Sequence, residues 1–434
     1  MTPAKIDSKP NKARAFNPFL RAATDNMKDL IVEVQKQVVG YELYHKLRKR
    51  ARKGADQVTF ERILEAIVCD LCVCVLQPEI DAVHLPLSNK VLRQKSRYKG
   101  LALGKTLPDI LQVLTAEETQ FVGLKKGTSK FIIIDEMMNV AFAGGVQTTI
   151  WAEHKLLSRI ERFGIGFEDI RQDPEEEVIV LRAPKAPPDQ RAKEQKYQDT
   201  PDTLTLRAQL TDINTWIAGA DLHCDLPEVN TQDRYLRRIF NNADFAQGGR
   251  LYGGFWQSMS SQDRQEHIMI EGDCVVELDY GQMSLAMLYG IAGKTPSEGD
   301  LYDLSAFGIP TQYRKGLKKC IQAIVNSPNI PKRVPKGVRQ HLPKRCSMTD
   351  ILKAVEQKHA DIYPLMTSGI GMQLFRKESD ILVDVLLTLK TQGITALPIH
   401  DAVVVRDDKS DKAKAIMQKV FKEHTGITPD VTLG

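Results

Sequence analysis

The spacing of apolar residues along the chain predicts three long helices. Apolar positions recur every three or four residues in 25–53, 59–76 and 371–391, which is the period of an amphipathic helix. The second of these stretches is apolar on nearly all sides, so we expect it to be buried. It contains three cysteines, and no second Cys or His pair follows nearby to complete a zinc site. We therefore expect buried structural thiols at Cys69, Cys72 and Cys74.

Short apolar runs predict strands next to candidate chemistry. The stretch from Cys274 begins as a buried strand and changes to helical spacing after Gly281. From Ile394 to Val405, two apolar runs flank His400-Asp401, which predicts a β-hairpin with that pair at its tip. An acid at the end of a buried strand is costly unless a partner such as a metal ion pairs with it. Asp279 is such an acid.

The pattern divides the chain into four parts. Residues 1–24 are rich in Lys, Pro and Asn and are expected to be a disordered basic tail. Residues 25–170 are expected to form a mainly helical domain. Within it, two helices followed by a basic hairpin at 121–134 have the order of a winged-helix unit, and a purely structural α+β segment is the alternative. Residues 171–203 carry the densest proline and charge and are expected to be a linker. Residues 204–434 are the candidate catalytic domain, and the fold class is α+β.

Charge is unevenly placed in a chain that is nearly balanced. The 434 residues carry a net charge of +5. Residues 1–53 hold thirteen Lys/Arg against five Asp/Glu, and ten Lys/Arg fall between Arg314 and Arg345 without any acid. Such blocks indicate contact with a polyanion, although a solvated surface is the alternative. No apolar run is long enough to span a membrane, and seven cysteines suit a reducing compartment, so we expect a cytoplasmic protein without membrane contact.

Three pieces of candidate chemistry follow one another along the chain. Asp279 ends a strand, Arg314 and Lys318 share one face of a helix because they are four residues apart, and Asp401 lies at a hairpin tip. Two carboxylates can hold two Mg²⁺ ions for phosphoryl transfer, while cations on a helix face neutralise a triphosphate. Asp279 and Asp401 can meet only if their strands are neighbours in one sheet.

The same pieces resemble a known family. Residues 279–284, D-Y-G-Q-M-S, are similar to motif A of the family A DNA polymerases, usually D-Y-S-Q-I-E, and the R-x-x-x-K and H-D pairs follow in the family's order. The resemblance covers residues from about 230 to 405. It implies a right-hand polymerase with an antiparallel palm sheet and helical fingers from about 295 to 365.

The resemblance also implies roles for individual residues. Asp279, Asp401 and the backbone carbonyl of Tyr280 would bind two Mg²⁺ ions, with Mn²⁺ as an alternative. Arg314 and Lys318 would face the phosphates of a nucleoside triphosphate, and His400 would support the primer terminus or the metal site. The remaining substrate-binding positions are Tyr280, Gln282, Ser284 and Arg250. Arg250 would contact the minor groove of a DNA primer–template, and Arg264 is a weaker candidate for a second contact.

Departures from the family pattern leave the function open in part. Ser284 stands where the family usually has a glutamate that helps to exclude the 2′-hydroxyl, and Ala402 replaces another acid. Glu277, two residues before Asp279, is expected to pack against neighbours or form a salt bridge, with compensation for the lost acid as the alternative. The leading hypothesis is a compact DNA-directed DNA polymerase. The alternatives are a primase-like or RNA-synthesising polymerase and a non-catalytic DNA-binding replication protein, and the sequence leaves the oligomeric state open.

Overall fold

The protein is described by a computed structural model that covers residues 12–133, 140–185 and 192–434. The chain forms two compact units, which are described separately below. The first unit consists of Met1–Glu177 and Leu226–Asp233, and the second of Val178–Asp225 and Arg234–Gly434. The boundary after Glu177 falls inside the proline-rich stretch at 171–203.

The first unit packs helices against a four-stranded sheet of order β1-β3-β7-β4. Its strands are β1 (Ala13–Ala15), β3 (Ala82–Leu85), β7 (Thr148–Ala152) and β4 (Val122–Lys125). Its helices are α1 (Asp25–Tyr44), α2 (Gly54–Leu76), α3 (Asn89–Arg93), α4 (Leu107–Leu114) and α5 (His154–Phe163). Strands β2 (Leu20–Ala22) and β8 (Ile170–Gln172) form a separate antiparallel pair.

Helix α2 is the centre of the core of this unit, as its apolar sequence predicts. Its buried residues lie on all sides of the helix from Ile63 to Cys74. The three cysteines of the helix are free and buried, and burial raises the pKa of the Cys74 thiol to about 11. The interpretation as structural thiols is therefore confirmed.

Helix α1 ends earlier than its apolar spacing predicts. It stops at Tyr44, and Lys46 takes the left-handed backbone conformation at φ 54°. Six of the nine residues at 45–53 are Lys or Arg. Like charges one turn apart destabilise a helix, which accounts for the early end.

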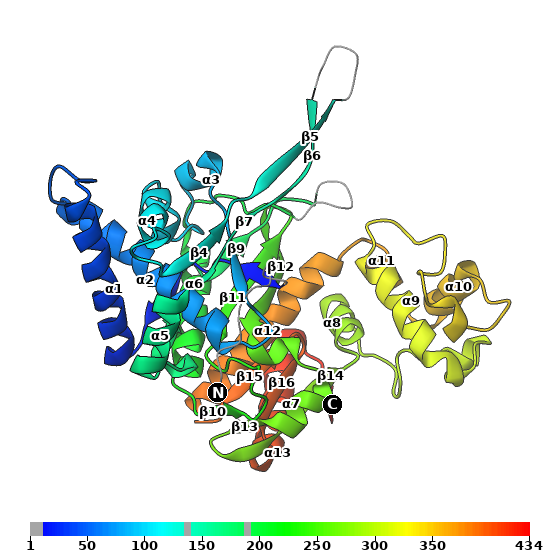
Figure 1. Ribbon diagram of the computed structural model, residues 1–434. Coiled ribbons are helices and arrows are strands. Elements are labelled where there is room, and N and C mark those ends of the chain that lie inside the picture. The colour runs from blue at the N-terminus through cyan, green and yellow to red at the C-terminus, as the bar shows by residue number, and fades with distance from the viewer. Residues whose placement is uncertain (1–11, 134–139, 186–191) are drawn as a thin grey trace. The chain divides into compact units, whose positions relative to one another are not determined.

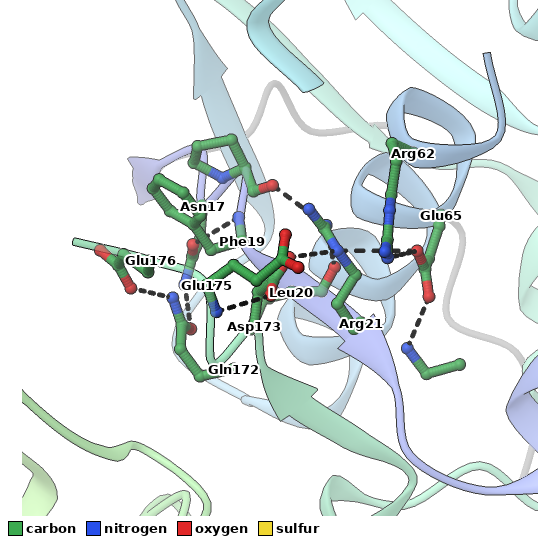
Figure 2. A network of polar contacts seen from close by, with 12 residues as sticks. Asn17, Phe19, Leu20, Arg21, Arg62, Glu65, Gln172, Asp173, Glu175 and Glu176 are labelled. Atoms are coloured by element: carbon green, nitrogen blue, oxygen red, sulfur yellow. Dashed lines mark hydrogen bonds and ion pairs between the residues drawn. The ribbon is translucent and has the colours of Figure 1, made fainter. Parts of the chain in front are cut away.

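Residues 12–24, predicted to belong to a disordered tail, include strands β1 and β2, whereas residues 1–11 lie outside the described part of the chain. Arg21 is buried in β2, where its Nε donates to Asp173 Oδ2 at 3.0 Å and lies 3.7 Å from Glu65 of α2 (Figure 2). Glu65 also accepts the backbone N–H of Ala22 at 3.1 Å. A polar composition indicated disorder, but these polar groups find buried partners far away in the sequence.

The predicted hairpin around the Lys-Gly turn does not form. Strand β4 pairs with β7, whereas β5 (Thr128–Ile133) pairs with β6 (Val140–Val146) in a two-stranded antiparallel sheet (Figure 1). The two strands that the sequence predicts at 121–134 therefore exist but belong to different sheets. The helix–helix–hairpin order alone does not make a winged-helix unit here.

The second unit is built on the predicted antiparallel sheet, which has six strands. Its order is β10-β13-β14-β16-β15, and β17 pairs with the far end of β14. The strands are β10 (Leu222–Cys224), β13 (Ile268–Ile270), β14 (Asp273–Gly281), β15 (Ala396–Ile399), β16 (Ala402–Arg406) and β17 (Asp430–Leu433). The right-hand arrangement stays a prediction.

A long helix and a second, smaller sheet support this sheet. Helix α12 runs from Gly371–Thr391, as predicted, and packs on β12 and β15. The smaller sheet has the order β12-β11-β9. Its strands are β9 (Ile179–Leu181), β11 (Arg234–Asn241) and β12 (Asp244–Gly254).

The second unit contains further helices. They are α6 (Pro201–Ala218), α7 (Ser261–His267), α8 (Met283–Ala292), α9 (Arg314–Asn326), α10 (Met348–Lys358), α11 (Tyr363–Met366) and α13 (Ser410–Thr425). Helices α9 to α11 are the yellow group in Figure 1 and fall in the stretch expected to form helical fingers. None of the described helices is long and apolar enough to cross a membrane.

Candidate active site

Strand pairing brings the two predicted acids together. Strands β14 and β16 are antiparallel neighbours, and Asp279 lies opposite Ala402 in the register. The backbone N–H of Tyr280 donates to the carbonyl of Asp401 at 3.4 Å. The prediction that these strands adjoin in one sheet is therefore confirmed, although the two acids are 122 positions apart in the sequence.

The carboxylate of Asp279 is in an electrostatically unfavourable place. Its Oδ1 is buried and has no hydrogen-bond partner among the residues that the structure describes. Burial, followed by the negative charge of Asp401, raises the pKa of Asp279 to about 7, and the Lys318 ammonium opposes this shift. A buried polar atom without a partner is rare in folded proteins and indicates that something else satisfies it.

The hairpin tip places Asp401 by means of a strained residue. His400 has φ 53°, a left-handed conformation that is uncommon for a residue other than glycine. Its ring centroid lies 6.0 Å from that of Tyr252, and burial, helped by the charge of Arg250, lowers the pKa of the imidazole. His400 is therefore largely neutral near pH 7 and turns the chain so that Asp401 follows directly at the tip.

Helix α9 presents the two predicted cations around one aromatic ring. The apolar face of the helix, which includes Leu317 and Ile321, is buried, so the opposite positions remain free for charge. The guanidinium of Arg314 lies 5.5 Å from the ring centroid of Tyr302, and the Lys318 Nζ lies 5.8 Å from it. Burial raises the pKa of Tyr302 to about 12, so its hydroxyl stays neutral.

Residues 300–303 form a junction that the sequence did not predict. Asp300 accepts two hydrogen bonds from Arg314, and its Oδ1 also accepts the N–H of Tyr302 at 3.0 Å. Lys358 donates to the carbonyl of Asp300 at 2.8 Å, and His359 contacts the carbonyl of Leu301 at 2.9 Å. The only sequence signal was the short D-L-Y-D-L segment, which does not reveal these long-range contacts.

The three predicted substrate-binding residues that follow Asp279 differ in how far their side chains are free to contact a substrate. The hydroxyl of Tyr280 is buried and donates to the carbonyl of Met417 at 2.7 Å. Gln282 has φ 59° at the start of α8, and its side chain accepts the N–H of Leu301. Ser284 is half-buried in the first turn of the same helix. Substrate contact by these residues stays a prediction.

Two predicted DNA-contacting arginines are bound within the protein. Arg250 of β12 forms two hydrogen bonds with the buried Glu378 of α12, one of them 2.9 Å long, and its guanidinium lies 4.0 Å from the ring centroid of Phe375. Arg264 is 6% exposed and donates to Glu277 at 2.6 Å. Arg264 is thus held within the fold and its contact with DNA stays a prediction, whereas the expected salt bridge of Glu277 is confirmed.

The residues present fit a hard divalent cation that is completed by a substrate. In the part of the chain that the structure describes, no three His, Cys, Asp or Glu side chains gather into a metal cluster. Asp279 and Asp401 supply two carboxylates, and the unpartnered Oδ1 of Asp279 is available as a ligand. Mg²⁺ is usually held by one or two carboxylates together with water and phosphate oxygens, so this donor set is sufficient.

Comparisons with known proteins find a distant likeness in structure. No family model matches the chain, and no curated protein matches it in sequence. The fold is similar to that of the POL domain of Pol1 from M. smegmatis in complex with a DNA primer-template and dNTP, with a TM-score of 0.33 and 10% sequence identity. The match covers 96% of this chain and 66% of that one, so this chain spans just under two thirds of the neighbour's length. A likeness at this level carries no functional assignment.

Proposed function

We propose that the protein is a template-directed nucleotidyltransferase, most simply a DNA-directed DNA polymerase. The observation that carries the proposal is the buried, unpartnered Oδ1 of Asp279 beside Asp401, with Lys318 close enough to lower the pKa of the Asp279 carboxyl. Two acids with a facing cationic helix are suited to joining a nucleotide to a growing strand. A nuclease mechanism would give Arg314 and Lys318 no role, because it has no triphosphate for them to bind.

Each residue of the site has a defined part in this proposal. Asp279 and Asp401 would hold Mg²⁺, together with the backbone carbonyl of Tyr280. When bound, the metal would activate the attacking 3′-hydroxyl and neutralise charge on the phosphates. Lys318 and Arg314 would bind the triphosphate, and Lys318 would donate a proton to the departing pyrophosphate. His400, neutral near pH 7, would hold the hairpin tip in place.

The basic stretch after α9 is suited to a nucleic-acid strand. Five of its cations are exposed and form no ion pair with a described residue: Lys332, Arg333, Lys336, Lys344 and Arg345. By contrast, Arg339 is used internally, donating to the carbonyl of Pro343 at 2.9 Å. Exposed cations without acidic neighbours bind phosphates through the release of counterions.

Primer extension tests the proposal. The purified protein, a labelled DNA primer–template, Mg²⁺ and four dNTPs should give extended primer. Asp279→Asn and Asp401→Asn should each reduce the rate on the order of 10³-fold or more, because each removes a carboxylate that would hold Mg²⁺. The control Asp411→Asn removes an exposed acid from α13 and should leave the rate unchanged. Activity that survives both site substitutions would refute the proposal.

The sugar of the nucleotide is the main alternative within this function. Ser284 is small and half-buried at the start of α8, so it leaves room that a glutamate would fill. We therefore include an assay with four rNTPs, in which incorporation would identify a primase-like or RNA-synthesising enzyme. Ser284→Glu should then shift the preference toward dNTPs. Binding of primer–template without any incorporation would instead favour a non-catalytic DNA-binding protein.

A further inference from the structure

A second candidate binding surface lies in the first unit, at the end of α1. Tyr44 is 83% exposed, and the neighbouring Leu43 and Leu47 are 68% and 52% exposed. The loop that follows carries five exposed cations, none of which pairs with a residue that the structure describes: Lys46, Arg48, Lys49, Arg50 and Lys53. We refer to Tyr44 and these five residues as the basic–aromatic surface.

The loop that carries these cations is anchored to the helices on either side of it. Arg52, the sixth cation of the segment, is bound by the buried Glu42 of α1 at 2.5 Å, and its guanidinium lies 3.6 Å from the ring centroid of Phe60 in α2. The backbone N–H of Leu47 donates to the carbonyl of Glu42 at 3.0 Å. One cation thus fixes the loop, and the other five remain in solvent.

Aromatic rings adjoin the cations at the end of α1. The ring of His45 lies 4.1 Å from that of Tyr41 and 5.0 Å from that of Tyr44, measured between centroids. Tyr44 meets His45 edge to face at 78°, so the Tyr44 ring is supported from the protein side while most of its surface is exposed. An exposed, supported ring beside unpaired cations is the combination that binds unstacked bases and their phosphates.

We infer that the basic–aromatic surface binds single-stranded nucleic acid. Phosphates would be neutralised by the five cations, and a base would stack on Tyr44. Charge complementarity favours a polyanion. An anionic membrane is the less suitable partner, because the apolar face of α1, including Leu30, Val34 and Val38, is fully buried in the core. At this end of α1, Leu43 and Leu47 are left to enter lipid, which is a small apolar area for an interfacial helix. The surface lies within the first unit, so the inference does not depend on the chemistry proposed for Asp279 and Asp401.

Binding of a labelled dT₂₀ oligonucleotide to the full chain, without Mg²⁺ or nucleotides, tests the inference. The triple variant Arg48→Gln, Lys49→Gln, Arg50→Gln should weaken binding at least tenfold and reduce the slope of log K against log salt by about 2, because three phosphate contacts are lost. Tyr44→Ala should weaken binding by about fivefold or more without changing that slope, and Tyr44→Phe should restore it. The control triple Lys36→Gln, Lys90→Gln, Lys105→Gln removes the same charge from exposed positions elsewhere in this unit and should have little effect.

A photocrosslink locates the contact. An oligonucleotide that carries 5-iododeoxyuridine should crosslink to a peptide containing Tyr44, as identified by mass spectrometry. Crosslinks confined to residues of the second unit, or equal weakening by the two triple variants, would overturn the inference. So would binding of vesicles with 30% phosphatidylserine that depends on the same residues while dT₂₀ binding does not. Asp279→Asn should keep the crosslink, which separates this result from a failure of the proposed catalysis.

Discussion

At the scale of single residues, the cost of keeping Asp279 charged is measurable. Its pKa is about 7 in the fold and close to 4 in an unfolded chain, so the folded protein loses stability as the pH rises from about 4 through 7. Asp279→Asn removes this loss. We expect the variant to be more stable than the parent by about 1–2 kcal/mol at pH 8, discounted because the side chain keeps some contact with water. Urea unfolding at pH 5 and pH 8 measures the difference.

The result at low pH is the control for that experiment. At pH 5 the Asp279 carboxyl is protonated in the fold but ionised in the unfolded chain, so roughly a third of the loss is present and the two proteins should differ less than at pH 8. Mg²⁺ should reverse the order at pH 8, because only the parent carries the charge that binds it. An Asn variant that is less stable than the parent at pH 8 without metal would show that the carboxylate has a partner within the protein.

The contact between Asp300 and Arg314 predicts an effect on nucleotide binding, if the proposed function is correct. Arg314 must leave Asp300 to reach a triphosphate, and the ion pair is largely exposed, so it is worth about 1 kcal/mol or less. Asp300→Asn keeps an oxygen for the N–H of Tyr302 but weakens the hold on Arg314. The KM for the nucleotide should fall about two- to fivefold with kcat unchanged.

An exposed ion pair nearby provides the comparison for this variant. Asp361 lies 3.6 Å from Lys294, and Asp361→Asn should leave both kinetic constants as they are. If Asp300→Asn instead raises the KM, Asp300 positions Arg314 for the substrate rather than competing with it.

At the scale of elements, an ion pair connects β12 to α12. Glu378 is 2% exposed, and burial raises its pKa while Arg250 opposes the shift. Arg250→Ala leaves a buried carboxylate without its partner, so we expect a loss of about 3–5 kcal/mol in the free energy of unfolding. The double variant Arg250→Met, Glu378→Gln removes both charges and should recover much of that loss. Urea unfolding measures both.

An exposed ion pair provides the control with which the loss of stability in Arg250→Ala can be compared. Lys419 and Glu423 form an exposed pair one turn apart on α13, and Lys419→Ala should cost no more than about 0.5 kcal/mol. Equal losses for Arg250→Ala and Lys419→Ala would mean that Arg250 does not hold Glu378. Arg250 would then be free for the DNA contact that the family resemblance implies.

The elements that the sequence predicted are those whose patterns are local. Helix α12, strand β14 and the β15–β16 hairpin follow from apolar spacing, and the hairpin alone placed Asp401 at its tip. The meeting of Asp279 with Asp401 also followed, because chemistry required their strands to adjoin. The pairing of β4 with β7 rather than with β5 could not be predicted, since the sequence of a strand does not specify its partner and the choice depends on the rest of the sheet.

Contacts between polar residues that are distant in sequence were also missed. The sequence places Arg21 in a stretch predicted to be a disordered basic tail. The structure shows that Arg21 is buried and bonded to Asp173. The same holds for Arg264 and Arg250, whose acidic partners lie on other elements. A sequence pattern shows where a cation is, whereas its partner depends on the tertiary fold.

At the scale of the whole molecule, each unit has a hydrophobic core of its own. The core of the first unit is centred on α2, where Ile67 is fully buried, and in the second unit Leu386 of α12 is fully buried. Truncating a fully buried Leu or Ile to Ala typically costs about 2–5 kcal/mol. Because stability is distributed over cooperative regions of a protein, we expect each loss to be confined to its own unit.

Hydrogen exchange followed by mass spectrometry tests this expectation. Ile67→Ala should speed the exchange of protected amides in α1 and α2 by about 30-fold or more, and leave those of α12 and β16 near the parent rate. Leu386→Ala should do the reverse. If either substitution speeds exchange equally in both units, the chain unfolds as one cooperative body. Binding of dT₂₀ and nucleotide incorporation would then be lost together in destabilised variants, whereas separate units predict that Ile67→Ala impairs the first function before the second.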